Sequence, residues 1–312
     1  MRSIFGALIS LIFCVSVVAQ DGTPRPRILG IASVHFYSSD IQAARSFYSK
    51  IVHPEGTCLW CEETPMQGVN LGAQQTLFLP LVVPLSSGQH LTLSKPIKAP
   101  PRNLLYEIVF ATENVQAMKK YLLANKIHIE KVEGTRDNYC AVIDPEGHRI
   151  AFAQPTQSMS AASSSAADMR IIHAGFVVND RAATDHFYKD VLGFRPYWHG
   201  GMKDDKDDWV AMQVPDGTDW VEYMLNISPT ADKHTLGVMN HIALGVPDIQ
   251  AAKAQLLKNG WKPGEEPKLG RDGKWQLNLY DPDDTRVEFM EFTPKEKPCC
   301  SEFTGPHPGP KQ

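Results

Sequence analysis

The chain has 312 residues, of which 43% are hydrophobic and 21% are charged, and its formal net charge is −4. At roughly 150 residues per domain this length predicts two domains, and the ordinary composition excludes disordered, collagen-like and coiled-coil proteins. A net charge this close to zero lacks the basic footprint that phosphate binding requires, so nucleic acid is excluded as a partner.

The chain opens on an apolar run with the layout of a secretory signal. Arg2 provides the positive start, residues 4–18 form the apolar stretch, and Val17-Val18-Ala19 supplies small residues for cleavage. The run is shorter than the ~20 residues that a membrane-spanning helix needs. We therefore expect residues 1–19 to be removed and the mature protein to be exported, periplasmic or secreted, without stable membrane insertion.

Five cysteines would remain after cleavage, at Cys58, Cys61, Cys140, Cys299 and Cys300. An odd number in an oxidising compartment leaves at least one thiol free or paired between chains. Cys58 and Cys61 have redox-motif spacing, but their Pro/Gly-bounded surroundings favour a structural staple. The pair Cys299-Cys300, with His307 nearby, fits either a metal site or a tail tied down by a disulfide, and the pairing stays open.

A helix-start phrase recurs four times, beginning at Asp40, Asn114, Asp180 and Asp248, with separations of 74, 66 and 68 residues. Asp and Asn are good helix N-caps because their side chains accept an orphan backbone N–H. β-Branched and aromatic runs of strand character surround each phrase. Those before it are 31–37, 106–111, 171–178 and 241–246, and the clearest after it are 75–81, 139–143, 209–214, 220–225, 275–280 and 286–292. The repeating unit is therefore one strand, one helix and about three strands.

Turns and a linker divide these units into two pairs. Asp144-Pro145-Glu146-Gly147 and Asp281-Pro282-Asp283-Asp284 each separate the last two strands of a unit. An Ala/Ser-rich stretch without periodicity follows the second unit, and we place a linker at 156–168. The predicted domains are 27–155 and 169–293, followed by a Pro/Gly/Cys tail at 294–312.

This organisation resembles the vicinal oxygen chelate superfamily, which includes glyoxalase I, bleomycin-resistance proteins and extradiol dioxygenases. The most specific piece is the Phe-Tyr-Lys-Asp-Val-Leu-Gly-Phe run at 187–194, of which the first domain keeps only Phe47-Tyr48. The resemblance implies an α+β fold in which each domain pairs two βαβββ units into a cupped, mixed or antiparallel sheet. It also implies a divalent metal at the base of the cup.

In such a domain the metal ligands come from the first and last strands of each unit, and in the second domain those strands hold His173, Glu222, His241 and Glu288. The two His are 68 residues apart and the two Glu are 66 apart, close to the 68 that separates the helix caps. Two imidazoles and two carboxylates suit Ni, Co, Fe(II), Mn or Zn. We expect one divalent metal ion per chain.

The first domain is predicted to be free of metal. Counting from the same caps and turns, its equivalent positions are Ser33, Phe78, Glu107 and Ala151, and only Glu107 can ligate. A lone histidine, His35, lies on the strand of Ser33 but lacks partners. We expect this domain to serve stability, a lid or a homodimer interface.

The ligand set bears on the reaction. In isomerases such as glyoxalase I, the resemblance implies four protein ligands, of which one carboxylate, here Glu222 or Glu288, leaves the metal and acts as base. Extradiol dioxygenases use two His and one carboxylate, here His173, His241 and Glu288. The additional Glu222 favours a glyoxalase-like lyase or isomerase acting on a small substrate with vicinal oxygens.

Two alternatives stay open. The first is an extradiol-type or other dioxygenase, because the two-domain length matches the dioxygenase architecture better. Export would also place the protein where glutathione, the thiol cofactor of glyoxalase I, is scarce. A cup that only binds and sequesters a small molecule, as in resistance proteins, is the other alternative.

Strand alternation predicts the walls of the substrate pocket. Trp220 and Met224 share a strand face with Glu222, and Met290 and Arg286 share one with Glu288. The three apolar side chains predict an apolar pocket beside the metal. We interpret Arg286 as the partner of an acidic residue.

Overall fold

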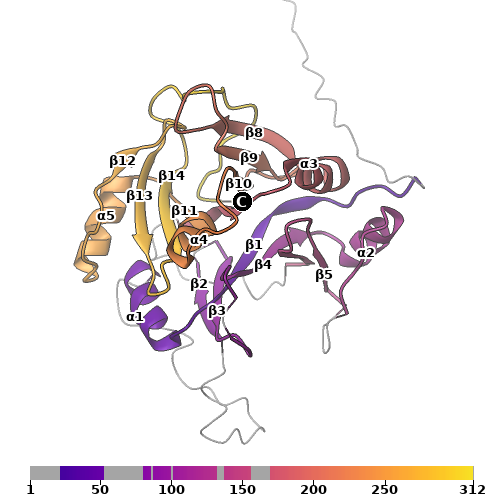
Figure 1. Cartoon of the computed structure of the whole chain (residues 1–312), viewed down its shortest axis with the longest axis horizontal. Coiled ribbons are helices and arrows are strands. Elements are labelled where there is room, and N and C mark those ends of the chain that lie inside the picture. Colours follow the sequence, from indigo (N-terminus) through magenta and orange to yellow (C-terminus); the bar gives the residue numbers. More distant parts are fainter. Residues whose placement is uncertain are drawn as a thin grey trace, which may run out of the picture.

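The structure is a computed structural model that describes residues 22–52, 80–85, 87–99, 101–131, 137–155 and 169–311. It has the predicted α+β fold, with two curled mixed sheets (Figure 1). The strands of the first sheet are β1 (Ile28–Tyr37), β2 (Leu81–Pro84), β3 (His90–Ser94), β4 (Leu105–Thr112), β5 (Tyr139–Ile143) and β6 (Arg149–Ala153). They lie in the order β2-β3-β1-β4-β6-β5, and the helices α1 (Ile41–Val52) and α2 (Val115–Ala124) connect them.

The second sheet has the same plan with two further strands. Its strands are β7 (Arg170–Val177), β8 (Arg195–Gly200), β9 (Trp209–Gln213), β10 (Trp220–Met224), β11 (His241–Val246), β12 (Lys268–Leu269), β13 (Trp275–Tyr280) and β14 (Arg286–Glu291). Their order is β12-β13-β14-β11-β7-β10-β9-β8. The helices are α3 (Arg181–Asp185), which continues into the π-helical turn η3 (His186–Val191), α4 (Lys233–Met239) and α5 (Ile249–Lys258).

The four repeated phrases are confirmed as helix starts. Asp40, Asn114, Asp180 and Asp248 each accept a hydrogen bond from the backbone N–H three residues further on, at N···O distances of 2.7–3.1 Å. The side-chain oxygen thereby satisfies a donor that the first helical turn leaves without a partner. Local capping chemistry therefore fixes where each unit turns from strand to helix.

Two units meet in each sheet at an antiparallel pair of strands. In the second sheet β7 pairs with β11, and each of them has a parallel neighbour, β10 and β14 respectively. In the first sheet β1 pairs with β4, and the parallel neighbours are β3 and β6. The same strand positions therefore recur four times around two local two-fold axes.

One hydrophobic core joins the two sheets. Because strand side chains alternate between faces, Phe36 and Phe110 of the first sheet and Phe176 and Phe289 of the second point into the same buried cluster. The helices α1, α2 and η3 contribute to it as well, and Figure 1 shows α1 near the end of β13 and α2 near α3. The core thus lies between the domains, and the other face of each sheet forms its own concave surface, the first cup and the second cup.

Paired hydrogen bonds connect the helices of one domain to the turns of the other. The Tyr48 hydroxyl on α1 donates to Asp281 at 3.1 Å, and the Tyr188 hydroxyl on η3 donates to Asp144 at 3.0 Å. Both aspartates begin the Asp-Pro turns predicted from the sequence. Gln89 adds a third connection, because its amide nitrogen donates to the carbonyls of Ile31 and Ile171, one in each sheet.

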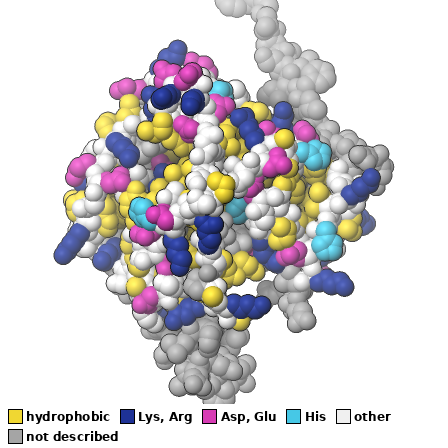
Figure 2. Space-filling view, viewed as in Figure 1, with side chains coloured by type: hydrophobic (Ala, Val, Ile, Leu, Met, Phe, Trp, Pro, Cys, Tyr) yellow, Lys and Arg dark blue, Asp and Glu magenta, His cyan; other side chains and the backbone are white. Residues whose placement is uncertain are grey.

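Several predictions fall on residues outside the described part of the chain. These are the signal segment, the linker, Cys58 and Cys61, and nearly all of the strand expected at 75–81. Within the described residues, β3, β8, β12 and α4 were not predicted, and β2 overlaps the strand expected at 75–81 only at Leu81. No helix of the described residues is long and apolar enough to cross a membrane. On the described surface in Figure 2, basic and acidic side chains are interspersed.

Candidate metal centre

The structure brings together all four side chains predicted as metal ligands, at the base of the second cup. His173 lies on β7, Glu222 on β10, His241 on β11 and Glu288 on β14. These are the four central strands of the sheet, where they lie in the order β14-β11-β7-β10. The two Nε2 atoms lie 3.1 Å apart. The carboxylate oxygens of Glu222 and Glu288 lie 3.8 Å from His173 Nε2, and 3.4 and 3.7 Å from His241 Nε2. Neighbouring ligands around a metal with bonds of roughly 2.1 Å lie roughly 3 Å apart. The separations suit an ion shared by His173, Glu222 and His241, whose ligand atoms all lie within 4.8 Å of one another, and Glu288 lies near both histidines.

A glycine makes room for one of the imidazoles. Gly175 on β7 pairs in register with His241 on β11. A Cβ atom added to Gly175 would lie 2.1 Å from Cε1 of that imidazole, a distance that no real contact allows. The absence of a side chain on β7 therefore permits the ring of His241 to lie over the strand and reach the centre of the cup.

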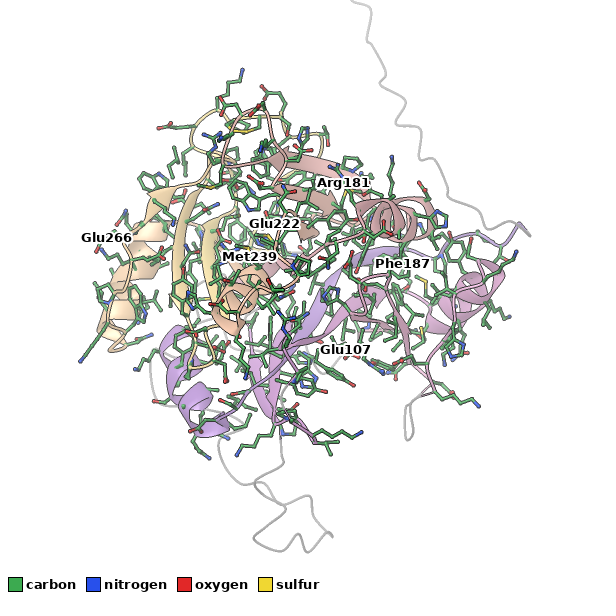
Figure 3. The ribbon with its side chains drawn as sticks, in the orientation of Figure 1. Glu107, Arg181, Phe187, Glu222, Met239 and Glu266 are labelled. Atoms are coloured by element: carbon green, nitrogen blue, oxygen red, sulfur yellow. A yellow bond between two sulfur atoms is a disulfide. The ribbon has the colours of Figure 1, made fainter. Side chains whose placement is uncertain are left out.

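Hydrogen bonding fixes the protonation pattern of His241. Its Nδ1 lies 3.0 Å from the carbonyl oxygen of Met239, at the end of α4, so the Nδ1–H donates and the Nε2 lone pair faces the cup. The orientation of a ligating imidazole by a carbonyl partner is common in metal sites. Figure 3 labels Met239 and Glu222 in the second domain.

Burial sets the charges of these groups. Both imidazoles are fully buried, and desolvation lowers the pKa of His173 and of His241 well below the usual value. Desolvation also raises the pKa of Glu288 to about 7. Glu222 is the most exposed of the four, with 13% of its side chain accessible. The histidines are therefore neutral, which is the form that binds a metal.

A cavity of about 260 Å³ opens beside the four ligands, and both Glu222 and Glu288 line it. Trp220 and Met290 line it as predicted, together with Trp198 and Trp209. Met224 does not line it, which corrects the prediction. Met224 is buried on the Glu222 face of β10, but it lies opposite Trp209, two residue pairs beyond the ligand.

Arg286 lies closer to the ligands than the sequence indicated. Its Nη2 donates to His241 Nε2 at 2.7 Å and lies 3.9 Å from a Glu288 oxygen. The acidic partner expected for Arg286 is therefore Glu288, at the outer limit of an ion pair. The guanidinium also lines the cavity.

Lys274 was not predicted to belong to the site. It is fully buried and its ammonium group lies 4.7 Å from the centre of the Trp220 ring, 5.3 Å from that of Phe303 and 5.7 Å from that of Tyr197. All three rings line the cavity. Desolvation lowers the pKa of Lys274 to about 8.

The C-terminal tail forms part of the wall of the second cup. Phe303 lines the cavity, and the tail is held by a hydrogen bond of 2.6 Å between His307 Nδ1 and the Tyr197 hydroxyl. Cys299 and Cys300 form a disulfide with each other. This bond closes a ring between adjacent residues and connects the tail to no other segment, so the tail is held by its other contacts and not by the cysteines. Cys140 is a buried free thiol in the first sheet.

The first cup holds different groups at the equivalent positions. Strand register confirms Ser33, Glu107 and Ala151 as the counterparts of His173, His241 and Glu288. Phe78 was the wrong counterpart of Glu222. It lies outside the described residues, and the register places Thr92 of β3 at that position. A cavity of about 430 Å³ is lined by Ser33, Thr92 and Glu107.

An arginine pairs with the one carboxylate among the first-cup positions. Arg149 Nε donates to Glu107 at 2.7 Å, and Figure 3 labels Glu107 in the first sheet, away from Glu222. The one carboxylate among these first-cup positions is thus already paired. The positions of the other three ligands are taken by Ser33, Thr92 and Ala151.

Comparisons with known proteins agree with this fold and site. The family model described as "Glyoxalase/Bleomycin resistance protein/Dioxygenase superfamily" matches residues 170–289, which include all four ligand positions. A lactoylglutathione lyase of Haemophilus influenzae is 30% identical over 125 residues, which are 39% of this chain and 93% of that protein.

Solved structures resemble nearly the whole chain. A variant of homoprotocatechuate 2,3-dioxygenase from Brevibacterium fuscum superposes with a TM-score of 0.60 at 17% identity, over 91% of this chain and 75% of that one. The enzyme of the same name from Arthrobacter globiformis gives 0.59 at 17% identity, over 91% and 84%. At this identity the likeness shows the two-domain fold alone. With the family model and the lyase, it confirms the resemblance to vicinal oxygen chelate proteins, and the chain belongs to the Glyoxalase/Bleomycin resistance protein/Dioxygenase superfamily.

Proposed function

We propose that the second cup binds one divalent metal ion through His173, Glu222, His241 and Glu288, and that the protein is a glyoxalase-like lyase or isomerase. Its substrate would be a small molecule with two neighbouring oxygens. The observation that carries the proposal is the convergence of two neutral imidazoles and two carboxylates beside a cavity. The two imidazole Nε2 atoms lie 3.1 Å apart, and each carboxylate lies 3.4–3.8 Å from them.

The donor set suits Ni, Co, Mn, Fe(II) or Zn, since imidazole and carboxylate are the ligands that these ions share. When bound, the ion supplies positive charge that stabilises an enolate-like anion on the substrate. Glu222 and Glu288 both face the cavity and are placed to take a proton from a substrate carbon. Glu222 is the favoured base, because its greater exposure allows it to swing away from the other ligands.

The walls of the cavity would hold the substrate and limit water. Trp198, Trp209, Trp220 and Met290 provide an apolar surface next to the two carboxylates. Apolar walls with a few convergent polar groups are typical of small-molecule sites. The 30% identity to a lactoylglutathione lyase over 125 residues supports this reaction class.

A dioxygenase is the second candidate. It is favoured by the two-domain fold, which superposes on homoprotocatechuate 2,3-dioxygenase over 91% of the chain. His173, His241 and Glu288 would then be the ligands, and Glu222 would be a cavity residue. A cup that sequesters a small molecule without turning it over is the third candidate.

Export is proposed as well, on the strength of the N-terminal sequence pattern. Small-molecule chemistry outside the cytoplasm would require a substrate available there. A homodimer formed through the first domain is likewise a proposal.

Elemental analysis of the mature protein, purified without chelators and under nitrogen, tests the proposal. We expect close to one equivalent of Ni, Co, Mn or Zn per chain, and turnover of dicarbonyl or hydroxycarbonyl substrates that is lost with the metal. One equivalent of Fe(II) with catechol cleavage would favour the dioxygenase. Absence of metal even after reconstitution would contradict both enzyme candidates.

A ligand variant locates the metal. His241→Ala should lower the metal content to near zero with an unchanged far-ultraviolet circular dichroism spectrum, because the side chain lies at the cup base and not in the shared core. Glu107→Gln changes the equivalent position of the first cup and is the matched control, which should keep one equivalent. Normal metal content in His241→Ala would show that the site lies elsewhere.

A further inference from the structure

An arginine occupies the same place in both cups. In the first sheet Arg149 of β6 pairs in register with Glu107 of β4. In the second sheet the register of β11 and β14 pairs Ile242 with Val287, which places Arg286 beside His241, the counterpart of Glu107. Arg149 and Arg286 are therefore equivalent residues, and their surroundings can be compared directly.

In the first cup this arginine has two carboxylate partners and one hydroxyl partner. Arg149 Nε donates to Glu107 at 2.7 Å, Nη1 donates to Glu130, and Nη2 donates to the Tyr139 hydroxyl at 3.3 Å. A guanidinium at this place in the fold thus has the geometry to receive carboxylates. Planar, multidentate contact with oxyanions is the arrangement for which arginine is best suited.

In the second cup the equivalent guanidinium lacks such partners. Arg286 is only 15% exposed, and the nearest carboxylate oxygen, on Glu288, is 3.9 Å away. Its Nε is buried without a hydrogen-bond partner among the described residues. Its one close acceptor is His241 Nε2, and a lone pair bound to a metal cannot also accept from Arg286. With metal in the site, the guanidinium is left nearly unpaired, which is costly for a buried charge.

The charge balance of the second cup leads to the same conclusion. Glu222 and Glu288 together balance a divalent ion. The other charged residues that line the cavity are Lys268, Arg271, Arg286 and Asp272. The fully buried Lys274 adds a further positive charge next to Asp272. The Lys274 ammonium group has no hydrogen-bond partner among the described residues. The metal-loaded cup therefore has an excess of positive charge.

We propose that the substrate carries an anionic group, a carboxylate or a comparable oxyanion, in addition to its two vicinal oxygens, and that Arg286 receives this group beside the metal. This inference rests on the proposed function, because it assumes a metal-bound chelating substrate. The substrate anion would take the part that Glu107 takes for Arg149 in the first cup. A neutral substrate would leave Arg286 unpaired, and a cationic one would be repelled.

Binding of chelating probes to the cobalt-loaded full chain tests the inference without turnover. The probes are catechol and its carboxylated forms 2,3- and 3,4-dihydroxybenzoate, and the visible absorption of Co(II) reports binding. We expect at least one carboxylated probe to bind roughly 10- to 100-fold more tightly than catechol, the range for hydrogen bonds to a charged group. Cobalt content is measured for every variant.

Three variants assign the preference to one residue. Arg286→Met should bind catechol within about threefold of the unmodified chain but lose the preference for the carboxylated probe. Arg286→Lys, which keeps the charge without the planar fork, should retain part of it and also serves if the methionine variant fails to hold cobalt. Arg149→Met changes the equivalent arginine of the first cup and should leave the preference intact.

Two results would overturn the inference. One is equal affinity of the unmodified chain for catechol and for both carboxylated probes. The other is a preference that persists in Arg286→Met. If the cobalt-loaded chain bound none of the probes, the proposed vicinal oxygen chelation would itself be contradicted, so the two failures are distinguishable.

Discussion

Desolvation acts in opposite directions on the two kinds of ligand in the second cup. It keeps His173 and His241 neutral, and it raises the pKa of Glu288 to about 7. Below that pH, the metal-free cup therefore holds two neutral imidazoles and a protonated Glu288, and His241 Nε2 accepts a hydrogen bond from Arg286. A metal ion must displace that proton before it can use the carboxylate.

Metal affinity should consequently follow the ionisation of Glu288. We expect the affinity for Co(II) to rise about tenfold per pH unit up to pH 7, as one proton is displaced, and then to level off. Competition titrations with a chelator between pH 5.5 and 8.5 measure this. Glu288→Gln should bind more weakly and lose the slope. A midpoint near pH 6.5 that persists in Glu288→Gln would assign the dependence to a histidine instead.

Lys274 carries a charge that the fold disfavours. Its pKa is about 8 in the folded chain and 10.5 as an unperturbed group. The unfolded chain thus binds more protons between pH 8 and 10.5, so the cost of the buried charge is fully present below pH 8 and disappears as the pH approaches 10.5. The pKa difference between the folded and unfolded chain corresponds to a destabilisation of about 3 kcal/mol. The cation–π contact with Trp220 offsets about 1 kcal/mol of it.

We therefore expect Lys274→Met to raise the free energy of unfolding of the metal-free chain by about 2 kcal/mol at pH 7. The gain should shrink when the measurement is repeated at pH 10. Denaturant titrations at both pH values provide the test, with Lys268→Met, which removes an exposed lysine of the same cavity rim, as the control. A variant less stable than the parent at pH 7 would mean that the ammonium group is stabilising.

At the scale of elements, local chemistry made the helix starts and central strands predictable. Asp40, Asn114, Asp180 and Asp248 begin helices because a cap acts within three residues of itself. The ligand strands could be located because they are regular and recur at nearly constant spacing. His173 and His241 are therefore found by counting along the chain.

Features that depend on tertiary contacts could not be predicted from the sequence. β8 contains Pro196 and no clear alternation, and it is a strand because it pairs with β9 at the sheet edge. α4 is short and contains Gly237, where an added Cβ would lie 2.6 Å from the Asp284 carbonyl oxygen, so packing decides its place. Thr92 was missed because the units differ in loop length, and counting from caps then fails. Lys274 was missed because its cage comes from three separate segments.

The C-terminal tail covers part of the second cup through Phe303. Phe303 contacts Tyr197 and Trp198, with ring centres 4.9 and 6.4 Å apart, and both partners line the cavity. Phe303→Ala should lower the free energy of unfolding by about 2 kcal/mol, since the ring is only half-buried, and should increase quenching of tryptophan fluorescence by acrylamide. Phe303→Leu keeps apolar cover and is the control. Unchanged quenching in Phe303→Ala would show that the tail does not shield the cup.

At the scale of the whole molecule, the shared core couples the two domains. Phe110 of the first sheet lies 5.4 Å, ring centre to ring centre, from Phe194 of the second domain. The reciprocal bonds from Tyr48 to Asp281 and from Tyr188 to Asp144 cross the same boundary. Neither domain can expose its helices and sheet face to water without losing this burial, so separate unfolding is unfavourable.

We therefore expect one unfolding transition for the whole chain, and a change in the first domain should be felt by the second. Five of the six tryptophans lie in residues 169–293, so fluorescence reports on the second domain. Phe110→Leu should lower the midpoint of that fluorescence transition by about 3 °C, for a loss of about 1 kcal/mol. Metal at 100 times its dissociation constant should raise the midpoint of the same single transition, by about 2.7 kcal/mol of added stability. A fluorescence midpoint indifferent to Phe110→Leu would mean that the domains unfold independently, and the first cup would then have no energetic means of influencing the metal centre.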